Sequence, residues 1–186
     1  MRTAPALVVA ALSLLALAGC VPDDDPVIPG PLPSSTPIFA SDEEALAAAE
    51  EAYGAYLAVS DQIIADGGQR PDRLLEVATQ EVLDVEIEGY EQLVELGWHG
   101  VGASTLDHLT LQSFDAFAVG GKAAVTVYAC VDVSGVDIQD SAGVSVVSAD
   151  RPSRTPFQTT FDTSGDGPPG LVLAAKEPWS GDDFCD

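Results

Sequence analysis

The spacing of the hydrophobic residues changes near Thr105, and this change is what most restricts the folds open to the chain. Before that point, apolar residues recur every three or four positions, which is the spacing of one face of an α-helix. After it, apolar and polar residues alternate as they do in half-buried β-strands. Helices followed by a run of antiparallel strands predict an α+β fold, with N-terminal helices packed on a curved sheet.

Three helices are expected in the first part of the chain. Ser41 and Glu44 form a capping box that begins a long helix, and Gly67 ends it. Pro71 occupies the first turn of a short second helix that runs to about residue 78. The third helix, over residues 81–96, has two apolar rows, and this breadth predicts that it lies between a sheet and another helix. The rows are Val82, Val85, Leu93 and Leu96, and Leu83, Ile87, Tyr90 and Val94.

The first two strands are expected to form a hairpin. Residues 105–117 are followed by Gly120-Gly121, a two-residue turn signal, and by a returning strand over residues 122–134. If these glycines make the turn, Phe114 lies opposite Val127, and a slip by one residue would exchange the two faces. In this register one face turns toward the helices. Its residues are His108, Thr110, Gln112 and Phe114 with Val125, Val127, Ala129, Val131 and Val133.

Three further strands complete the expected sheet. The returning strand continues to Ile138, turns over residues 140–143 and pairs with residues 144–148. The last two strands, over residues 157–163 and 171–176, are joined by a loop rich in glycine and proline. Residues 41–186 are therefore predicted to form a single α+β domain, which is long enough for one sizeable core.

The charge balance excludes one class of partner. The chain has 7 Lys and Arg against 30 Asp and Glu, a formal net charge of −23 at pH 7. Such a chain repels phosphate backbones, so nucleic acid is excluded as a partner. Anionic membrane surfaces repel it as well, so a basic patch cannot hold it to a membrane.

The N-terminus has the pattern of an export signal. A basic start at Arg2 precedes an apolar run over residues 4–18, which suits a signal peptide and is too short to span a bilayer. The segment Leu17-Ala18-Gly19-Cys20 resembles the lipobox of bacterial lipoproteins. That resemblance implies a signal peptide over residues 1–19, a lipid on Cys20, and a membrane partner at the extracytoplasmic face of the cell membrane. An ordinary secretion signal with an incidental cysteine is the alternative.

Residues 20–40 are expected to form a tether. They contain six prolines and three consecutive aspartates, a composition that cannot build a core. A proline-rich segment favours extended conformations of about 3.1 Å per residue. The tether is either a spacer of required length or a run without a length requirement, and the sequence leaves both open.

The remaining two cysteines are expected to pair. Cys130 and Cys185 are an even pair in a chain predicted to reach an oxidising compartment, where disulfides persist. Two free thiols are the alternative. Neither cysteine belongs to a Cys-x-x-Cys pattern of the kind that binds metals.

The order of elements resembles the nuclear transport factor 2-like fold, and within it the SnoaL-like group. Three short stretches, Gly97-Trp98-His99, residues 128–132 and residues 179–185, are similar to uncharacterised lipoproteins of high-GC Gram-positive bacteria. The resemblance implies a cone-like, cystatin-like roll with a cavity between sheet and helix. Some members are isomerases or cyclases that use an acidic base in this cavity, and many are binding modules.

Few residues carry recognisable chemistry. His99 and His108 are the only histidines, so a multi-histidine metal site is excluded, and no nucleotide, metalloprotease or hydrolase motif occurs, which predicts no cofactor. No residue is assigned a catalytic role. Polar residues on the expected core face predict a ligand pocket, although a histidine at the wet rim of the sheet is the alternative for His108. The predicted pocket lining is His108, Thr110, Gln112 and Phe114.

Two functions follow from these observations. The favoured one is a lipid-anchored, non-catalytic extracytoplasmic domain that binds a small ligand or an envelope protein. The alternative is a SnoaL-like isomerase or hydrolase that uses a cavity carboxylate. In the expected register Asp107, Asp115 and Asp132 lie on the face turned away from the helices. None of them could then act as a base in the cavity, which argues against the enzyme.

Overall fold

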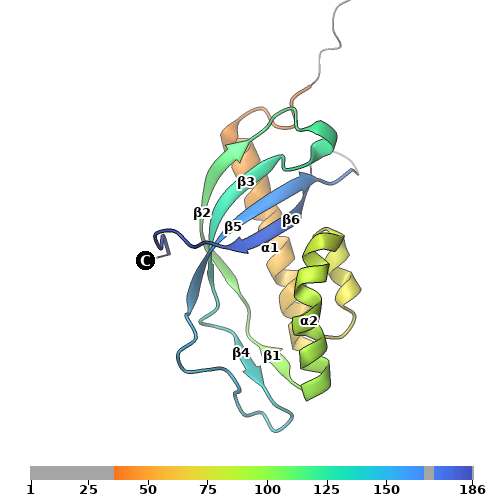
Figure 1. Cartoon of the computed structure of the whole chain (residues 1–186), viewed down its shortest axis with the longest axis vertical. Coiled ribbons are helices and arrows are strands. Elements are labelled where there is room, and N and C mark those ends of the chain that lie inside the picture. Colours follow the sequence, from red (N-terminus) through yellow and green to blue (C-terminus); the bar gives the residue numbers. More distant parts are fainter. Residues whose placement is uncertain (1–35, 166–169, 186) are drawn as a thin grey trace, which may run out of the picture. The chain divides into compact units, whose positions relative to one another are not determined.

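A computed structural model describes residues 36–165 and 170–185 and has the α+β architecture expected from the sequence. Two α-helices pack on an antiparallel four-stranded sheet of order β2-β3-β5-β6, which curves without closing into a barrel (Figure 1). Its strands are β2 (Thr105–Phe114), β3 (Val125–Asp132), β5 (Arg154–Thr163) and β6 (Leu171–Pro178). A second, two-stranded sheet pairs β1 (His99–Val101) with β4 (Asp137–Gln139). No helix in the described part of the chain is long and apolar enough to cross a membrane.

Local sequence signals determine where the long helix α1 (Asp42–Ala65) begins and ends. Ser41 caps it by accepting a hydrogen bond from the Glu44 amide, and the Glu44 carboxylate accepts one from the Ala40 amide at 2.7 Å. The expected capping box is therefore present, with the return bond displaced by one residue. Beyond the C-terminus, Gly67 and Gly68 take left-handed conformations that favour glycine.

The helix α2 (Gln80–Leu96) departs from expectation on its outer side. It follows a short 3₁₀ helix, η1 (Pro71–Glu76), and ends at Gly97 in a left-handed conformation. Its inner side buries Val82 and Leu83, whereas Val85 on the outer side is 73% exposed. The α2 helix packs against both β6 and η1 (Figure 1). The prediction of a covering helix is wrong only for its outer side, where Val85 and Leu96 are exposed among the described residues.

The β2–β3 register also differs from expectation. Leu109 pairs with Ala129 and Leu111 with Val127, and bulges interrupt β2 at Asp107 and Gln112. The strands are joined by residues 115–124, including a 3₁₀ turn, η2 (Val119–Gly121), and not by the two glycines alone. Between the two bulges the pairing is shifted from the expected one by an odd number of residues, which exchanges the faces of this part of β2. Leu109 and Leu111 therefore replace the predicted polar residues on the helix side.

The helix-facing side of β3 agrees with the sequence prediction. Val125, Val127, Ala129 and Val131 are buried against the helices. They pack with Phe161 of β5, Leu173 of β6 and the α1 tyrosines in one core. Beyond Asp132 the chain turns, and β4 forms separately instead of continuing β3 to Ile138, while residues 144–148 contribute only the bridge between Gln139 and Ser145.

The domain includes residues that we assigned to the tether. The Ile38 amide donates to the Ala116 carbonyl at 2.9 Å, and Phe39 is buried with its ring 5.7 Å from that of Phe114. The packed part of the chain therefore begins before Ser41. The predicted signal peptide, Cys20 and the tether through residue 35 lie outside the described residues.

Candidate functional site

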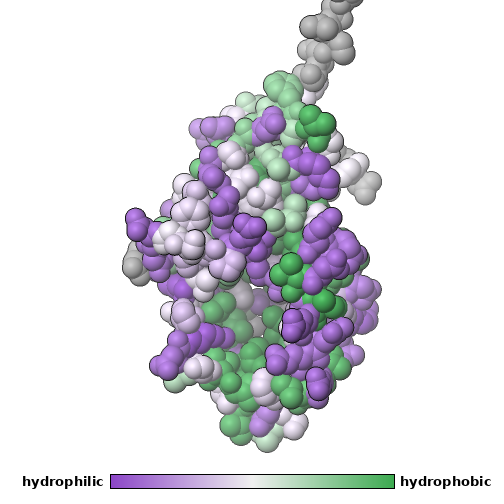
Figure 2. Space-filling view, in the orientation of Figure 1, coloured by the Kyte–Doolittle hydropathy of each residue, from purple (hydrophilic) through white to green (hydrophobic). Residues whose placement is uncertain are grey.

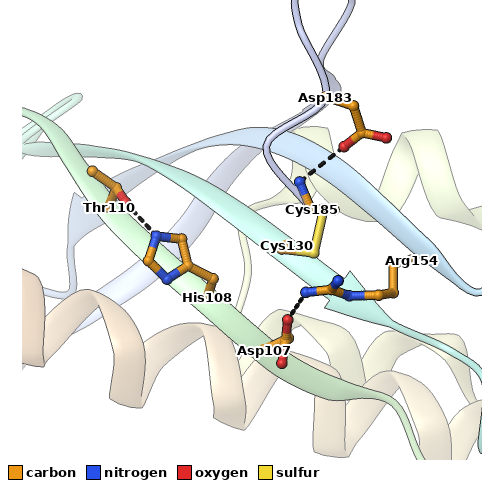
Figure 3. Close-up of a disulfide and its surroundings, with 7 residues drawn as sticks. All are labelled: Asp107, His108, Thr110, Cys130, Arg154, Asp183 and Cys185. Carbon is orange, nitrogen blue, oxygen red and sulfur yellow. Dashed lines mark hydrogen bonds and ion pairs between the residues drawn. A yellow bond between two sulfur atoms is a disulfide. The ribbon is translucent and has the colours of Figure 1, made fainter.

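The expected disulfide joins Cys130 of β3 to Cys185 in the C-terminal segment (Figure 3). The two Cα atoms are 5.5 Å apart, and both residues are buried. The bond lies on the side of the sheet opposite the helices, where the C-terminal segment crosses β3. On this side the Tyr128 ring contacts Trp179 and Phe184, with ring centroids 4.9 and 5.7 Å apart.

Three of the four residues predicted to line a pocket lie on this same outer side. His108 and Thr110 are exposed and bond to each other at 2.9 Å (Figure 3). Gln112 accepts a hydrogen bond from Gln158 at 3.1 Å. The prediction that these three face the helices is wrong, because the β2 register puts Leu109 and Leu111 there instead. Phe114 returns to the inner side after the second bulge and packs against the core.

The predicted location of the sheet aspartates is confirmed. Asp107 and Asp115 are exposed, and Asp107 forms an ion pair with Arg154 across the sheet (Figure 3). Asp132 is half-buried, and its carboxylate accepts a bond from the Ser134 amide at 2.7 Å. Hydrogen bonding from the Ser134 side chain and amide lowers the pKa of Asp132. None of these three carboxylates lies on the helix side of the sheet.

A pocket of about 200 Å³ opens between the inner side of the sheet and the two helices. Figure 2 shows the surface hollowed between the strands and α2, with hydrophobic residues around the hollow. The helix α1 supplies one wall, β3, β5 and β6 supply another, and Glu86 of α2 closes one side. Its polar lining residues are Tyr53, Tyr56, Ser60, Asp61, Glu86, Ser104, Thr155 and Lys176.

The centre of this lining is a hydrogen-bonded group of Tyr56, Glu86 and Lys176. The Lys176 ammonium lies 2.6 Å from Glu86 Oε1 and donates to the Tyr56 hydroxyl at 3.0 Å. The Tyr56 hydroxyl donates to the same Glu86 oxygen at 3.0 Å. Lys176 Nζ also lies 5.3 Å from the ring centroids of Tyr56 and Phe157, which stabilises its charge. The group therefore links α1, α2 and β6 at the pocket.

Two further bonded pairs join the walls of the pocket. Ser60 bonds to the Tyr90 hydroxyl at 3.0 Å, and the Asp61 carboxylate accepts bonds from the Ser104 amide and hydroxyl at 2.7 and 2.9 Å. Burial raises the pKa of the Tyr56 hydroxyl, and the neighbouring Glu86 charge raises it further. Burial also raises the pKa of Tyr90, so both hydroxyls are protonated donors at neutral pH.

Two buried hydroxyls near Lys176 have no hydrogen-bond partner among the residues that the structure describes. They are Tyr53 Oη, from a fully buried pocket-lining residue, and Thr159 Oγ1, on the inner side of β5 opposite Lys176. Burial raises the pKa of Tyr53, so its hydroxyl is a donor. Leaving a buried donor unpaired costs about 1–3 kcal/mol, and native proteins rarely do so without a reason. A ligand that accepts hydrogen bonds would satisfy this donor.

The residues that form this site were not predicted from the sequence. Glu86 is a charged residue among the apolar rows of α2, and Lys176 is one of two lysines in the chain. Both residues therefore stand out in the sequence. Their partnership joins residues far apart in the sequence and depends on how β6 meets the helices. His99, the other histidine, lies in β1 opposite Gln139 and is not part of the pocket lining.

The fold and the pocket define an α+β domain with a pocket between sheet and helices, and known proteins add only a similarity of fold. The chain is similar to the crystal structure of the intermembrane space region of the chloroplast protein ARC6, with a TM-score of 0.51 and 15% identity over 73% of this chain and 97% of that one. A solution structure of a de novo designed β-sheet protein aligns with a TM-score of 0.29 and 15% identity, over 76% and 96% of the two chains, and carries no argument. No protein-family model and no curated protein matches the sequence.

Proposed function

We propose that the protein is a lipid-anchored extracytoplasmic domain that binds a small ligand in the pocket between sheet and helices, without catalysing its conversion. The observation that carries the ligand site is Tyr53, a pocket-lining residue whose buried hydroxyl has no hydrogen-bond partner among the described residues. The lipobox-like Leu17-Ala18-Gly19-Cys20 supports the anchor. The resemblance to nuclear transport factor 2-like proteins agrees with a ligand site between sheet and helix.

The lining indicates the chemistry of the ligand. Apolar walls from Val131, Val133 and Phe157 favour a hydrophobic body, and the free Tyr53 donor favours a hydrogen-bond acceptor on it. The volume of about 200 Å³ lies below the roughly 300–1,000 Å³ of pockets that hold drug-sized molecules. The Lys176 and Glu86 charges already neutralise each other, so a neutral ligand fits best.

Binding can be tested with small cyclic ketones and amides by ligand-observed NMR on the chain that begins at Val21. We expect Val133→Phe, which fills the pocket mouth, to weaken binding at least tenfold. Thr110→Phe adds the same ring to the exposed outer side and serves as the matched control. Equal binding by both variants, or no binding of any fragment by the unaltered chain, would refute the proposed ligand site.

The alternative function is that of a SnoaL-like isomerase or hydrolase, and Glu86 is the carboxylate it would use. Glu86 lines the pocket, but its Oε1 already accepts bonds from Lys176 and Tyr56, while Asp61 accepts both bonds from Ser104. A general base must be free to accept a proton from substrate, and these bonds therefore favour binding. Conversion of a bound fragment that is lost in Glu86→Gln would favour the enzyme.

The anchor is tested separately by Cys20→Ala. We expect the unaltered protein to fractionate with membranes and the mature variant to appear in the soluble fraction, because the acylated thiol is the proposed attachment. Cys185→Ala removes a different cysteine and should remain with membranes. A Cys20→Ala protein that stays membrane-bound after removal of residues 1–19 would contradict the anchor.

A further inference from the structure

The proposed tether enters the domain beside the connection between β2 and β3. Ile38 donates its amide proton to the Ala116 carbonyl at 2.9 Å, and the Phe39 and Phe114 rings pack 5.7 Å apart. Residues 36–40, at the start of the coloured ribbon in Figure 1, lie next to this connection at one end of the sheet. The β2–β3 connection is therefore at the end of the domain that receives the chain from Cys20.

This connection exposes two large apolar side chains. Val119 is 91% exposed, and Phe117, two residues before it, is 58% exposed. Figure 2 shows hydrophobic atoms at this end of the domain. On a very acidic protein these two exposed side chains form a small hydrophobic patch that no described residue covers.

The connection is held in shape by its own hydrogen bonds. Asp115 accepts from the Phe117 amide at 2.9 Å through its carboxylate and from the Ala118 amide at 3.2 Å through its carbonyl. The Gly121 amide donates to the Ala118 carbonyl at 3.0 Å. At the base, Asp162 bonds to Lys122 Nζ at 2.6 Å and to the Ala123 amide at 2.8 Å. Phe117 and Val119 are thus presented on a structured turn.

We propose that residues 115–122 form a membrane-contacting tip, which places Phe117 and Val119 in the interfacial region of the bilayer that holds the Cys20 lipid. This inference depends on the proposed anchor. At the polyproline rise of about 3.1 Å per residue, a tether of residues 20–35 has a reach of roughly 50 Å, so the tip is able to touch the membrane surface. A tethered contact acts at high effective concentration, so even two apolar side chains add to the hold of a lipid anchor.

The charges around the tip are acidic, so only its apolar side chains can attract it to a membrane. Asp42, Glu43 and Glu44 form the acidic first turn of α1 at this end, and Lys122 is already paired with Asp162. These carboxylates disfavour anionic lipid headgroups. We therefore expect the tip to enter zwitterionic membranes more readily than anionic ones at low salt, with the difference shrinking as salt screens the repulsion.

The test uses acylated full-length protein in phosphatidylcholine vesicles whose acyl chains carry bromine, which quenches nearby tryptophan. Phe117→Trp should gain a tryptophan signal that the brominated lipid quenches at least twofold. Val144→Trp is the matched control, since Val144 is 60% exposed and adjoins the bridge to β4, at the opposite end of the domain in Figure 1. Its added signal should stay unquenched.

The outcomes separate the tip from the anchor. If the protein floats with vesicles but Phe117→Trp is no more quenched than Val144→Trp, the tip is refuted and the anchor stands. If the protein does not float with vesicles at all, both are refuted. A third outcome is that the chain beginning at Val21 forms concentration-dependent dimers and that a Phe117→Ser/Val119→Ser variant does not. This result would refute membrane contact by the tip and favour self-association. In the acylated protein that double variant should exchange between vesicles several-fold faster, with an unchanged unfolding midpoint.

Discussion

Tyr53 and Tyr56 show how far two neighbouring residues of one type can differ in role. Their rings stack at 5.7 Å with an interplanar angle of 6°, and both are buried. The Tyr56 hydroxyl bonds to Glu86 and Lys176, whereas the Tyr53 hydroxyl bonds to no group in the described part of the chain. Only the long helix that carries them was predicted from the sequence, because the partners of Tyr56 come from α2 and β6.

This difference predicts opposite effects of the same substitution. Tyr53→Phe should raise the free energy of unfolding by about 1 kcal/mol, because it removes a buried donor that has no partner. Tyr56→Phe should lower it by about 1–2 kcal/mol, because it removes bonds to charged groups. Urea denaturation of both variants, which are matched in chemistry and burial, measures the difference. Destabilisation by Tyr53→Phe as large as that by Tyr56→Phe would contradict the unpaired hydroxyl.

At the scale of elements, local signals predicted which segments become helices and strands, and they failed where a strand has bulges. The Ser41 cap, the Gly97 end of α2 and the alternation of β3 depend on neighbours in the sequence. The bulges at Asp107 and Gln112 leave no clear mark in the sequence, yet each changes which side of the sheet the following residues face. For this reason His108, Thr110 and Gln112 were predicted on the wrong side of the sheet.

The β2 register can be tested with two alanine substitutions in adjacent residues. Leu109→Ala should lower the free energy of unfolding by about 2 kcal/mol, because Leu109 packs against the core. His108→Ala should change it by less than about 0.5 kcal/mol, because His108 is exposed on the other side. Both values come from urea denaturation. The reverse order would restore the register predicted from the Gly120-Gly121 turn.

On the scale of the whole molecule, the disulfide links the C-terminal segment to the centre of the sheet. Its 55-residue sequence separation includes β4, β5 and β6, and with them Lys176 of the pocket. The count of cysteines and the export signal were enough to predict the pair, because no geometry enters that argument. The C-terminal segment covers Tyr128 on the outer side of the sheet, and the pocket lies on the inner side.

Removing the bond should therefore affect stability far more than the pocket. In the chain-entropy model a loop of this length contributes roughly 4 kcal/mol, which is a large part of a small domain's stability. We expect Cys130→Ala/Cys185→Ala to lower the free energy of unfolding by up to about that amount and to shift Trp179 emission to longer wavelength as the segment leaves Tyr128. Dithiothreitol should have the same effect on the unaltered protein and none on the double variant. An unchanged unfolding midpoint in reductant would contradict the stabilising role of the bond. If the reduced protein lost fragment binding under conditions in which it is still folded, the two sides of the sheet would be coupled.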